Sequence, residues 1–319
     1  MFNRTLQILA ALFLLSGLMS FFSDMGWLFD LASHFPVQSV VALTPLLLLA
    51  CLRKLKITLW VIITALGINI TALASTEWLA DKQHLAPATL STGTPYRLMT
   101  LNVLAGNTEY EKIGNLITRH EPDSVLILEL TPPLADHLAA QLTDYPYFFG
   151  QPVMRAAGIG VFSRHPMQHT ELLALGHQFT PAVHIEQTLP PTSGSQHSTL
   201  TLIGIHPWAP IAPEMHQLRT IQLRELGSAV KDIHQPLVVA GDFNITPWSK
   251  DFRSLLTVGQ LADSRVGFGI QGTWPSCLPL LSIPIDHILT SPGLSVKDRR
   301  VVRIEGSDHC GVMADLMIQ

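Results

Sequence analysis

The stretch Val238–Asn244 (VVAGDFN) ends with two polar side chains of types that handle phosphate. Its first three residues form an apolar run typical of a buried strand, and Gly241 lets the backbone turn sharply after it. Asp242 and Asn244 follow two residues apart, so both side chains can point the same way. A carboxylate beside an amide can hold a water molecule on one side and a phosphate oxygen on the other. An ordinary turn at the end of a strand would use the same two residues.

Polar residues of the same kinds recur at the ends of other predicted strands. Each is a weak signal alone, because a lone His or Asp at a strand end is more often a surface or turn residue. Their recurrence along the chain is a stronger indication of a shared site. Besides Asp242 and Asn244, the set comprises Asn102, Glu129, His206, Asp286, Asp308 and His309.

Hydrophobic periodicity predicts the elements that would carry these residues. Strands are expected at 96–104, 124–130, 158–162, 182–188, 198–206, 237–240, 285–289, 297–304 and 310–318. Helices are expected at 109–120, 132–142, 214–234 and 249–256, the third with Met215, Leu218, Ile221, Leu226, Val230 and Ile233 on its apolar face. Many strands and few long helices indicate a mixed α/β (α+β) sandwich, with sheets inside and helices outside.

Residues 96–319 resemble the endonuclease/exonuclease/phosphatase superfamily, whose fold is the DNase I-like one. The matching blocks are LNV (101–103), LEL (128–130), GVFSRHP (160–166), GIH (204–206), GDFN (241–244), IDHIL (285–289) and SDH (307–309). With its apolar N-terminus, the chain looks like the membrane-bound bacterial branch of this superfamily. The resemblance implies a four-layer α/β/β/α sandwich and a phosphohydrolase that depends on Mg²⁺ or Mn²⁺.

The chemistry of the residues is consistent with such a metal. Glu129 supplies a hard carboxylate oxygen, and Asn102 and Asp308 could add oxygens directly or through water. One or two carboxylates with waters and substrate oxygens is the usual environment of Mg²⁺. Zinc is disfavoured, because no Cys/His cluster has the spacing of a zinc site.

The resemblance also implies a role for each remaining residue. Asp242 would orient and deprotonate the attacking water, and Asn244 would help to bind the phosphate. His309 would contact the scissile phosphate, with Asp286 fixing its tautomer and favouring the imidazolium. His206 would stabilise the charge of the transition state or protonate the leaving oxygen. Trp208 and Trp274 could flank the mouth of the site, although Trp is as often a core or rim residue.

The composition of the first 76 residues predicts a membrane domain. Hydrophobic residues make up 47% of the 319-residue chain, charged residues make up 14%, and the mean hydropathy is +0.31. Uncharged apolar stretches at about 5–22, 37–52 and 57–74 predict three transmembrane helices. A cleavable signal peptide is the alternative for the first stretch, although it lacks a clear cleavage site.

Charged residues around these stretches predict the orientation of the chain. Arg4 and the cluster Arg53, Lys54 and Lys56 would be cytoplasmic by the positive-inside rule. Residues 77–95, which contain Pro, Ser and Gly, then form a linker, and residues 96–319 form the catalytic domain. The expected location is the bacterial cytoplasmic membrane, with the catalytic domain on its extracytoplasmic side.

Charge and cysteine content limit the possible partners. Residues 96–319 carry 15 Lys and Arg against 20 Asp and Glu, a net charge of −5 that suits a grip on long nucleic acid poorly. Cys277 and Cys310 could pair in an oxidising compartment, although two buried free thiols is the favoured interpretation. No protein partner is evident, whereas the lipid bilayer is an expected one.

Two hypotheses of different classes follow. The first is a membrane-anchored metal-dependent phosphohydrolase, whose substrate could be nucleic acid, a phospholipid headgroup or a small phosphodiester. The second is a catalytically silent binding or scaffold module that keeps the fold. The intact set of polar residues argues against the second hypothesis.

Overall fold

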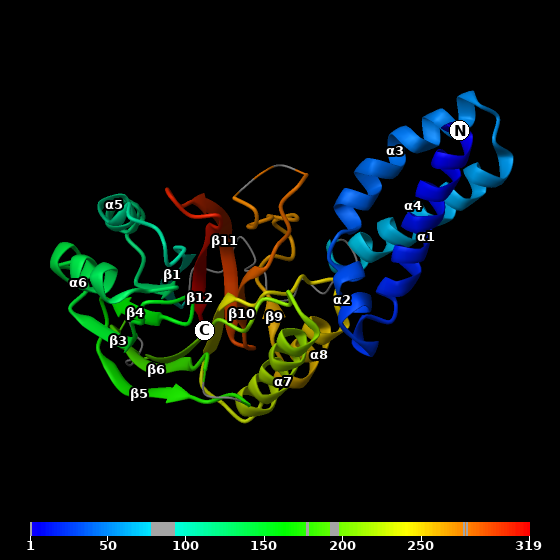
Figure 1. Cartoon of the computed structure of the whole chain (residues 1–319). Coiled ribbons are helices and arrows are strands. Elements are labelled where there is room, and N and C mark those ends of the chain that lie inside the picture. The colour runs from blue at the N-terminus through cyan, green and yellow to red at the C-terminus, as the bar shows by residue number, and fades with distance from the viewer. Residues whose placement is uncertain (1, 78–92, 177–178, 192–197, 277, 279) are drawn as a thin grey trace.

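In the computed structural model of the chain, an N-terminal bundle of helices leads into a larger α/β domain (Figure 1). The structure describes residues 2–77, 93–176, 179–191, 198–276, 278 and 280–319. Most of the expected linker at 77–95 lies outside these residues.

The bundle begins with helix α1 and returns twice along its own length. Its elements are α1 (Phe2–Ser20), the 3₁₀ turn η1 (Ser23–Met25), α2 (Trp27–Ser33), α3 (Pro36–Leu52) and α4 (Lys56–Glu77). Helices α1 and α4 are long and apolar enough to cross a membrane. The pair α2 and α3, bent by 67° at the break between them, adds a third span if it is counted as one. Helices α1, α3 and α4 thus lie where three spans were expected.

The bundle has a small core and an outer surface with many large apolar side chains. A small core that includes Leu6, Leu43 and Ile62 holds the helices together. Large apolar side chains are nevertheless exposed along the outside of the bundle, among them Ile8, Leu12, Leu15, Leu48, Leu52, Ile57 and Trp60. This arrangement is the one expected of helices whose outer faces contact lipid.

Two six-stranded sheets form the centre of the α/β domain. The first has the order β11-β12-β1-β2-β4-β3, with strands β1 (Thr94–Asn102), β2 (Ser124–Leu128), β3 (Tyr147–Gln151), β4 (Ile159–Ser163), β11 (Leu294–Arg303) and β12 (Cys310–Ile318). The second has the order β5-β6-β7-β8-β10-β9, with strands β5 (Met167–Leu173), β6 (Ala182–Leu189), β7 (Ser198–Ile205), β8 (Leu237–Asp242), β9 (Ala262–Asp263) and β10 (Asp286–Thr290).

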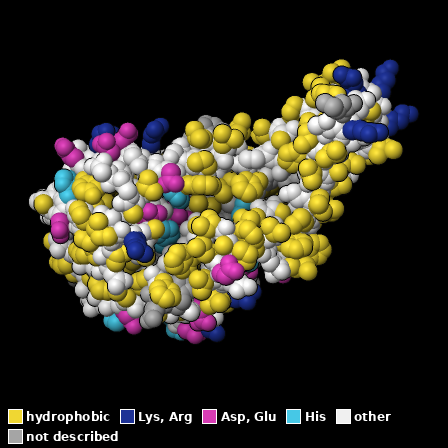
Figure 2. All heavy atoms as spheres, in the orientation of Figure 1, with side chains coloured by type: hydrophobic (Ala, Val, Ile, Leu, Met, Phe, Trp, Pro, Cys, Tyr) yellow, Lys and Arg dark blue, Asp and Glu magenta, His cyan; other side chains and the backbone are white. Residues whose placement is uncertain are grey.

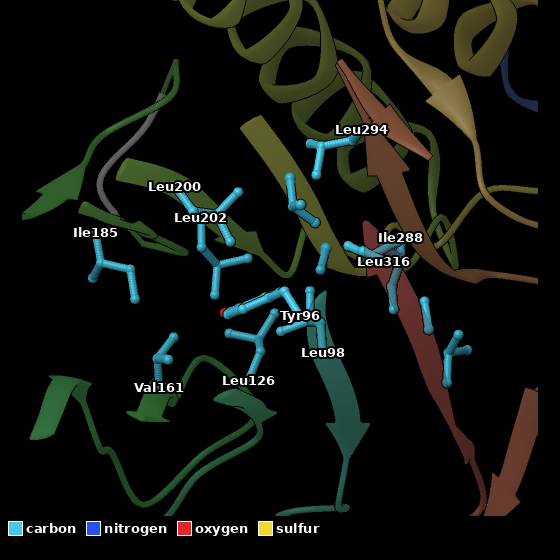
Figure 3. Close-up of a cluster of buried hydrophobic side chains, with 14 of the residues drawn as sticks. Tyr96, Leu98, Leu126, Val161, Ile185, Leu200, Leu202, Ile288, Leu294 and Leu316 are labelled. Atoms are coloured by element: carbon cyan, nitrogen blue, oxygen red, sulfur yellow. The ribbon is translucent and has the colours of Figure 1, made fainter. Parts of the chain in front are cut away.

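Each sheet is covered by helices on its outer face and by the other sheet on its inner face. Between the sheets, Tyr96, Leu98, Leu126 and Val161 of the first face Ile185, Leu200, Leu202 and Ile288 of the second (Figure 3). A second cluster joins the first sheet to α5 (Tyr110–His120) and α6 (Pro132–Gln141). A third joins the second sheet to α7 (Pro213–Val230) and α8 (Lys250–Gly259). The expected four-layer α/β/β/α sandwich is confirmed.

Strand directions bring the polar strand ends together. Strands β1 and β2 are parallel, and so are β7 and β8, so the carboxyl ends within each pair lie at the same edge. Strand β10 runs antiparallel to β8 and places Asp286 directly opposite Asp242. Strand β12 runs antiparallel to β1, so its amino end, which follows His309, lies beside the carboxyl end of β1. The topology therefore gathers these residues at one end of the sandwich.

The structure also differs from the sequence-based expectations at Cys310 and in helix α7. Cys310 is disulfide-bonded, so the expectation of two free thiols is wrong for this residue, and Cys277 lies outside the described residues. Helix α7 buries Arg219, Leu223 and Leu226, while Ile221, which was expected on its apolar face, is exposed. The apolar stripe was misplaced because a buried arginine occupies the face that packs.

Candidate active site

Asp242, the last residue of β8, is the most highly connected side chain of the site. Its side chain is buried, with one oxygen (Oδ1) accepting a hydrogen bond from the backbone N–H of Asn244 at 2.9 Å. The other oxygen (Oδ2) accepts one from Asn102 Nδ2 at 3.1 Å. The same oxygen lies 3.5 Å from His206 Nε2 and 3.6 Å from His309 Nε2. One oxygen of Asp242 thus stabilises the local turn, while the other faces Asn102, His206 and His309.

Electrostatics keep this carboxylate ionised. Burial would raise the pKa of Asp242, but the charge of His309 and the hydrogen bond and charge of His206 lower it to about 2. Burial would lower the pKa of His206, yet Asp242 and Glu129 raise it. The carboxylate of Asp242 therefore lies beside the imidazolium of His309 and the imidazole of His206, whose pKa it raises, and the opposite charges stabilise each other in a low-dielectric setting.

His309 is oriented by Asp286 from the adjoining strand. Its Nδ1 lies 2.9 Å from Asp286 Oδ2, and both side chains are almost fully buried. Burial would lower the pKa of His309, but the carboxylates of Asp286 and Asp242 raise it to about 10. The imidazolium is therefore held with Nδ1 toward Asp286 and Nε2 toward Asp242, and it can donate from Nε2 to a phosphate oxygen.

Asn244 lies in the turn after Asp242, in the left-handed conformation (φ 51°) that Asn tolerates. Its side-chain amide donates to the carbonyl of Pro207 at 3.0 Å. Its own carbonyl accepts from Arg219 Nη1 at 2.7 Å. These contacts tie the GDFN turn to the loop that follows His206, so the two loops are positioned together.

The three expected metal ligands lie at the ends of the first sheet. Asn102 Oδ1 accepts from the backbone N–H of Leu104 at 3.3 Å. Glu129, which adopts φ 59° just after β2, accepts from the N–H of Ala105 at 2.8 Å through Oε2. Asp308 is exposed and accepts from Trp274 Nε1 at 3.1 Å. Asn102 thus reaches the centre of the site directly, whereas Asp308 lies at its rim.

A second set of groups could also hold a metal ion. Ligand atoms of Asp242, Asp286 and His309 all lie within 4.8 Å of one another. His309 already bonds Asp286 as an imidazolium, and a protonated imidazole has no free lone pair for a metal. The oxygens of Asn102 and Glu129 are better suited to a hard cation, because they present neutral or anionic oxygen donors. The donor chemistry of the site therefore fits Mg²⁺ or Mn²⁺.

Two residues of the site carried no role in the sequence analysis. Ser307 donates to the carbonyl of Asn102 at 2.7 Å and accepts from the N–H of His309 at 3.0 Å, so it joins the two sides of the site. Ser307 belongs to the SDH block, which was a usable signal. Arg219 is buried beside the GDFN turn and has no motif around it. Its charge within an amphipathic helix was the one available sign.

On the face shown in Figure 2, acidic and His side chains gather near the middle of the α/β domain and are bordered by hydrophobic side chains. This face of the α/β domain therefore combines a concentrated group of charges with an apolar border. Such an arrangement can bind a phosphate group, orient a water molecule beside it and donate a proton to a leaving oxygen.

The sequence model of the Endonuclease/Exonuclease/phosphatase family matches residues 99–309. No curated protein matches the chain.

Solved structures share the fold of the α/β domain. An endonuclease/exonuclease/phosphatase from Beutenbergia cavernae DSM 12333 is 21% identical, with a TM-score of 0.55 over 70% of this chain and 72% of that chain. D. rerio TDP2 complexed with single strand DNA product is 17% identical, with a TM-score of 0.57 over 70% and 99% of the two chains. A mannosyl-6-phosphatase from Bacteroides thetaiotaomicron VPI-5482 is 15% identical, with a TM-score of 0.54 over 70% and 100%. At these identities the likeness concerns the fold alone.

Proposed function

The chain belongs to the Endonuclease/Exonuclease/phosphatase family, and from that membership we propose that it is a membrane-anchored phosphohydrolase dependent on Mg²⁺ or Mn²⁺. Members of this family are hydrolases that act on phosphate esters. The observation that carries the proposal is the position of Asp242, with one carboxylate oxygen 3.5 Å from His206 and 3.6 Å from His309. An ionised base between two proton donors is the arrangement that hydrolysis of a phosphate ester by water needs.

In the proposed reaction, water attacks phosphorus in line with the leaving oxygen. Asp242 holds and orients the water and takes its proton as the new P–O bond forms. His206 gives a proton to the leaving oxygen as the old P–O bond breaks. His309, held by Asp286, donates to a non-bridging phosphate oxygen. Asn244 supports phosphate binding from the turn beside Asp242.

Metal binding is assigned to Asn102, Glu129 and Asp308. When bound there, a divalent cation would stabilise the negative charge that develops on the phosphoryl oxygens. The hard oxygen donors of Asn102 and Glu129 support this assignment, because such donors suit Mg²⁺ and Mn²⁺.

The bundle is proposed to anchor the enzyme in the bacterial cytoplasmic membrane, with the α/β domain outside the cytoplasm. The turn between α3 and α4 lies at the end of the bundle away from the α/β domain (Figure 1), and Lys and Arg side chains gather at that end (Figure 2). This distribution supports a cytoplasmic location for that end by the positive-inside rule. The disulfide at Cys310 supports an oxidising compartment for the domain.

The net charge of residues 96–319 limits the kind of substrate that the α/β domain can bind well. The relatives include a DNA-bound TDP2 and a mannosyl-6-phosphatase, so both diesters and monoesters come into consideration. The net charge of −5 over residues 96–319 argues against a long nucleic acid, whose binding rests on many Lys and Arg contacts. A phosphate ester of modest size is the better fit.

The test uses the full-length protein in detergent with bis-p-nitrophenyl phosphate and Mg²⁺ or Mn²⁺. Asp242→Ala and His309→Ala should lower the rate to background. Asp232→Ala and His234→Ala, which change an exposed acid and an exposed His, should leave the rate unchanged. Equal background rates in the wild type and all four variants would favour the catalytically silent module instead.

A further inference from the structure

A hairpin that begins at Trp274 and ends at Ile283 lies between the active site and the bundle, and it carries several exposed apolar side chains. Trp274 and Ile283 pair across its base, where the N–H of Ile283 donates to the carbonyl of Trp274 at 2.6 Å. Ser282 Oγ adds a bond to the carbonyl of Pro275 at 2.7 Å. Leu278, Leu280 and Leu281 between them are exposed, the last two at 61% each. The described part of the hairpin is thus held at its base and presents leucines to its surroundings.

This hairpin contacts both the site and the bundle. At one end, Trp274 Nε1 donates to Asp308 Oδ2 at 3.1 Å. Toward the other, Gln38 Nε2 of α3 donates to the carbonyl of Leu281 at 3.0 Å. Phe35 and Val41, beside Gln38 in sequence, are exposed as well. In Figure 2, hydrophobic side chains run from the border of the acidic and His cluster to the bundle. The exposed leucines thus lie next to the first turns of α3, where apolar side chains of the bundle are exposed as well.

Water is an unfavourable environment for such a surface. Burying one Leu side chain stabilises a structure by an amount equivalent to at least about a tenfold change in a binding constant. Contiguous exposed apolar side chains in a soluble domain usually mark a partner or a membrane. Here the first turns of α3 begin beside the hairpin, which places it where a membrane-spanning bundle meets the water phase. A bilayer surface is the occupant that this position favours, and Trp is common at that level.

We propose that Leu280 and Leu281 of this hairpin rest in the leaflet from which the α/β domain emerges, and that the substrate is a phosphodiester carried by a membrane lipid. This proposal rests on the proposed function and narrows it. Such a lipid could bring its phosphate to Asp242 while its acyl chains stay in the bilayer. Water would add to phosphorus, the P–O bond to one alcohol would break, and that alcohol would leave with a proton. The products would be a phosphomonoester and an alcohol.

The experiment compares a lipid substrate with a soluble one. Full-length protein is reconstituted in phosphatidylcholine vesicles that contain phosphatidylglycerol and phosphatidylethanolamine, and released headgroups are measured with Mg²⁺ present. The double variant Leu280→Ser/Leu281→Ser should lower lipid hydrolysis at least about tenfold, because two apolar anchors are lost. Hydrolysis of bis-p-nitrophenyl phosphate should stay within about twofold, because the pairing of Trp274 with Ile283 and the bond from Gln38 to the Leu281 carbonyl use backbone atoms that both substitutions keep. Val258→Ser, an exposed apolar residue of α8, is the matched control and should change neither rate.

A second measurement reports membrane contact without activity. Leu280→Trp should be quenched by lipids brominated in their acyl chains, beyond the quenching of the wild type, and Val258→Trp should not be. Cleavage of the soluble ester with no cleavage of any vesicle lipid, or an unquenched Leu280→Trp, would overturn the lipid proposal and leave the phosphohydrolase intact. A wild-type protein that cleaves neither the soluble ester nor any vesicle lipid would overturn the proposed function itself. Quenching that decreases as the protein concentration rises would identify a second copy as the occupant and overturn the lipid proposal.

The segment between α1 and α3 makes buried polar contacts with the α/β domain. Asp30 of α2 and Arg219 of α7 form an ion pair at 2.6 Å in which both side chains are fully buried. His34 Nε2 lies 3.1 Å from the same oxygen of Asp30, and Ser249 Oγ donates to the other at 2.8 Å. The bundle is thus joined to the α/β domain by a buried charge network as well as by the linker.

This network holds the loop that follows Asp242. Arg219 Nη1 donates to the carbonyl of Asn244 at 2.7 Å. His34 Nδ1 lies 2.9 Å from Thr246 Oγ1. With the Ser249 bond to Asp30, the segment Asn244–Ser249 is fixed at three points, and Asn244 in turn donates to Asp242. Two of the side chains that fix it come from the bundle.

We infer that Asp30 is a positioning residue for the active site, so the bundle is part of the catalytic unit as well as an anchor. Asp30 acts through Arg219 and Ser249 on the turn that carries Asp242. A misplacement of about 1 Å in a catalytic group can cost about a hundredfold in rate. Loss of this support should therefore lower kcat about ten- to a hundredfold while KM changes little.

The test separates positioning from stability. Asp30→Ala alone leaves Arg219 buried without its carboxylate, which is strongly destabilising. Removing both charges in Asp30→Ala/Arg219→Met should restore much of the melting temperature, but kcat on bis-p-nitrophenyl phosphate should stay at least about tenfold low, because Asn244 remains unsupported. Asp24→Asn removes the exposed pair of Asp24 with Lys250 from the same segment and should change neither quantity. A stable double variant with wild-type kcat would overturn the inference.

Discussion

Gly241 immediately precedes the proposed catalytic base, and its replacement by Ala tests how Asp242 is positioned. Gly241 has φ +145°, a conformation that side chains rarely adopt. A Cβ built at this residue would lie 1.9 Å from the carbonyl oxygen of Ile205 on the neighbouring strand. Real Cβ atoms essentially never come within 3.0 Å of such an atom, so β7 and β8 must separate by about 1 Å.

The separation acts on stability and on rate. Backbone strain and overpacking together should lower the free energy of unfolding by about 2–5 kcal/mol. In a domain of this size that corresponds to a fall of about 5–15 °C in melting temperature. His206 follows Ile205 and Asp242 follows Gly241, so the same shift widens the 3.5 Å separation between their side chains. A shift of that size should lower kcat about a hundredfold.

The assay pairs thermal unfolding in detergent with the rate on bis-p-nitrophenyl phosphate at saturating Mg²⁺. Gly227→Ala is the matched control, because its Cβ would lie in ordinary contact, 3.4 Å from Val258, inside helix α7. Ala is the better helix former, so this control should be as stable as the wild type or slightly more so. A Gly241→Ala variant with wild-type stability and rate would refute the tight packing of β7 against β8 on which the site depends.

Three further outcomes are expected. Chelation of divalent cations should abolish hydrolysis, and Mg²⁺ or Mn²⁺ should restore it. Glu129→Gln should raise the metal concentration needed for activity about 10–100-fold. A rate that does not respond to chelator would contradict the proposed dependence on a metal ion. Burial lowers the pKa of His287 from 6.5 to about 4, so an unfolded chain takes up the proton first as pH falls, and stability should drop by about 2 kcal/mol between pH 7.5 and pH 5. His287→Gln should lose this part of the pH dependence of the melting temperature, and an unchanged dependence would contradict the assignment. A C-terminal alkaline phosphatase fusion should be active if the α/β domain lies outside the cytoplasm as proposed, and an inactive fusion would reverse the orientation.

Much of the fold could be predicted from sequence because its central strands are apolar and bounded by turns. Strands β2, β4, β7 and β8 are buried and read as short apolar runs. Strands β3 and β5 were missed because they lie at the edges of their sheets, and most of their residues are exposed or half-buried. Such strands need no apolar alternation, so periodicity does not reveal them.

The residues of the site could be predicted because each stands at a strand end within a recognisable block. Asp242, His206 and His309 meet through their strands, and strand direction alone brings them together. Their individual catalytic and metal-binding roles stay predictions, since geometry places side chains and leaves reactivity to experiment. The disulfide of Cys310 depends on distance between remote segments, which composition does not encode.

The contact between the bundle and the active-site loop could not be predicted. Asp30 and Arg219 are 189 residues apart in sequence, and neither lies in a motif. An Asp in a short segment between apolar helices is expected to be solvated, and an Arg in an amphipathic helix is expected on its polar face. A fully buried pair leaves no periodic signature in either segment.

Asp242 is proposed to activate the water that attacks phosphorus. The most direct measurement is kcat of Asp242→Asn relative to wild type, with full-length protein, bis-p-nitrophenyl phosphate and saturating Mg²⁺. The amide keeps the size of the side chain but is no longer a base, so kcat should fall about 10²–10⁴-fold while melting temperature and Mg²⁺ requirement change little. A kcat within about twofold of wild type in a folded Asp242→Asn protein would show that Asp242 is not the base that activates the water.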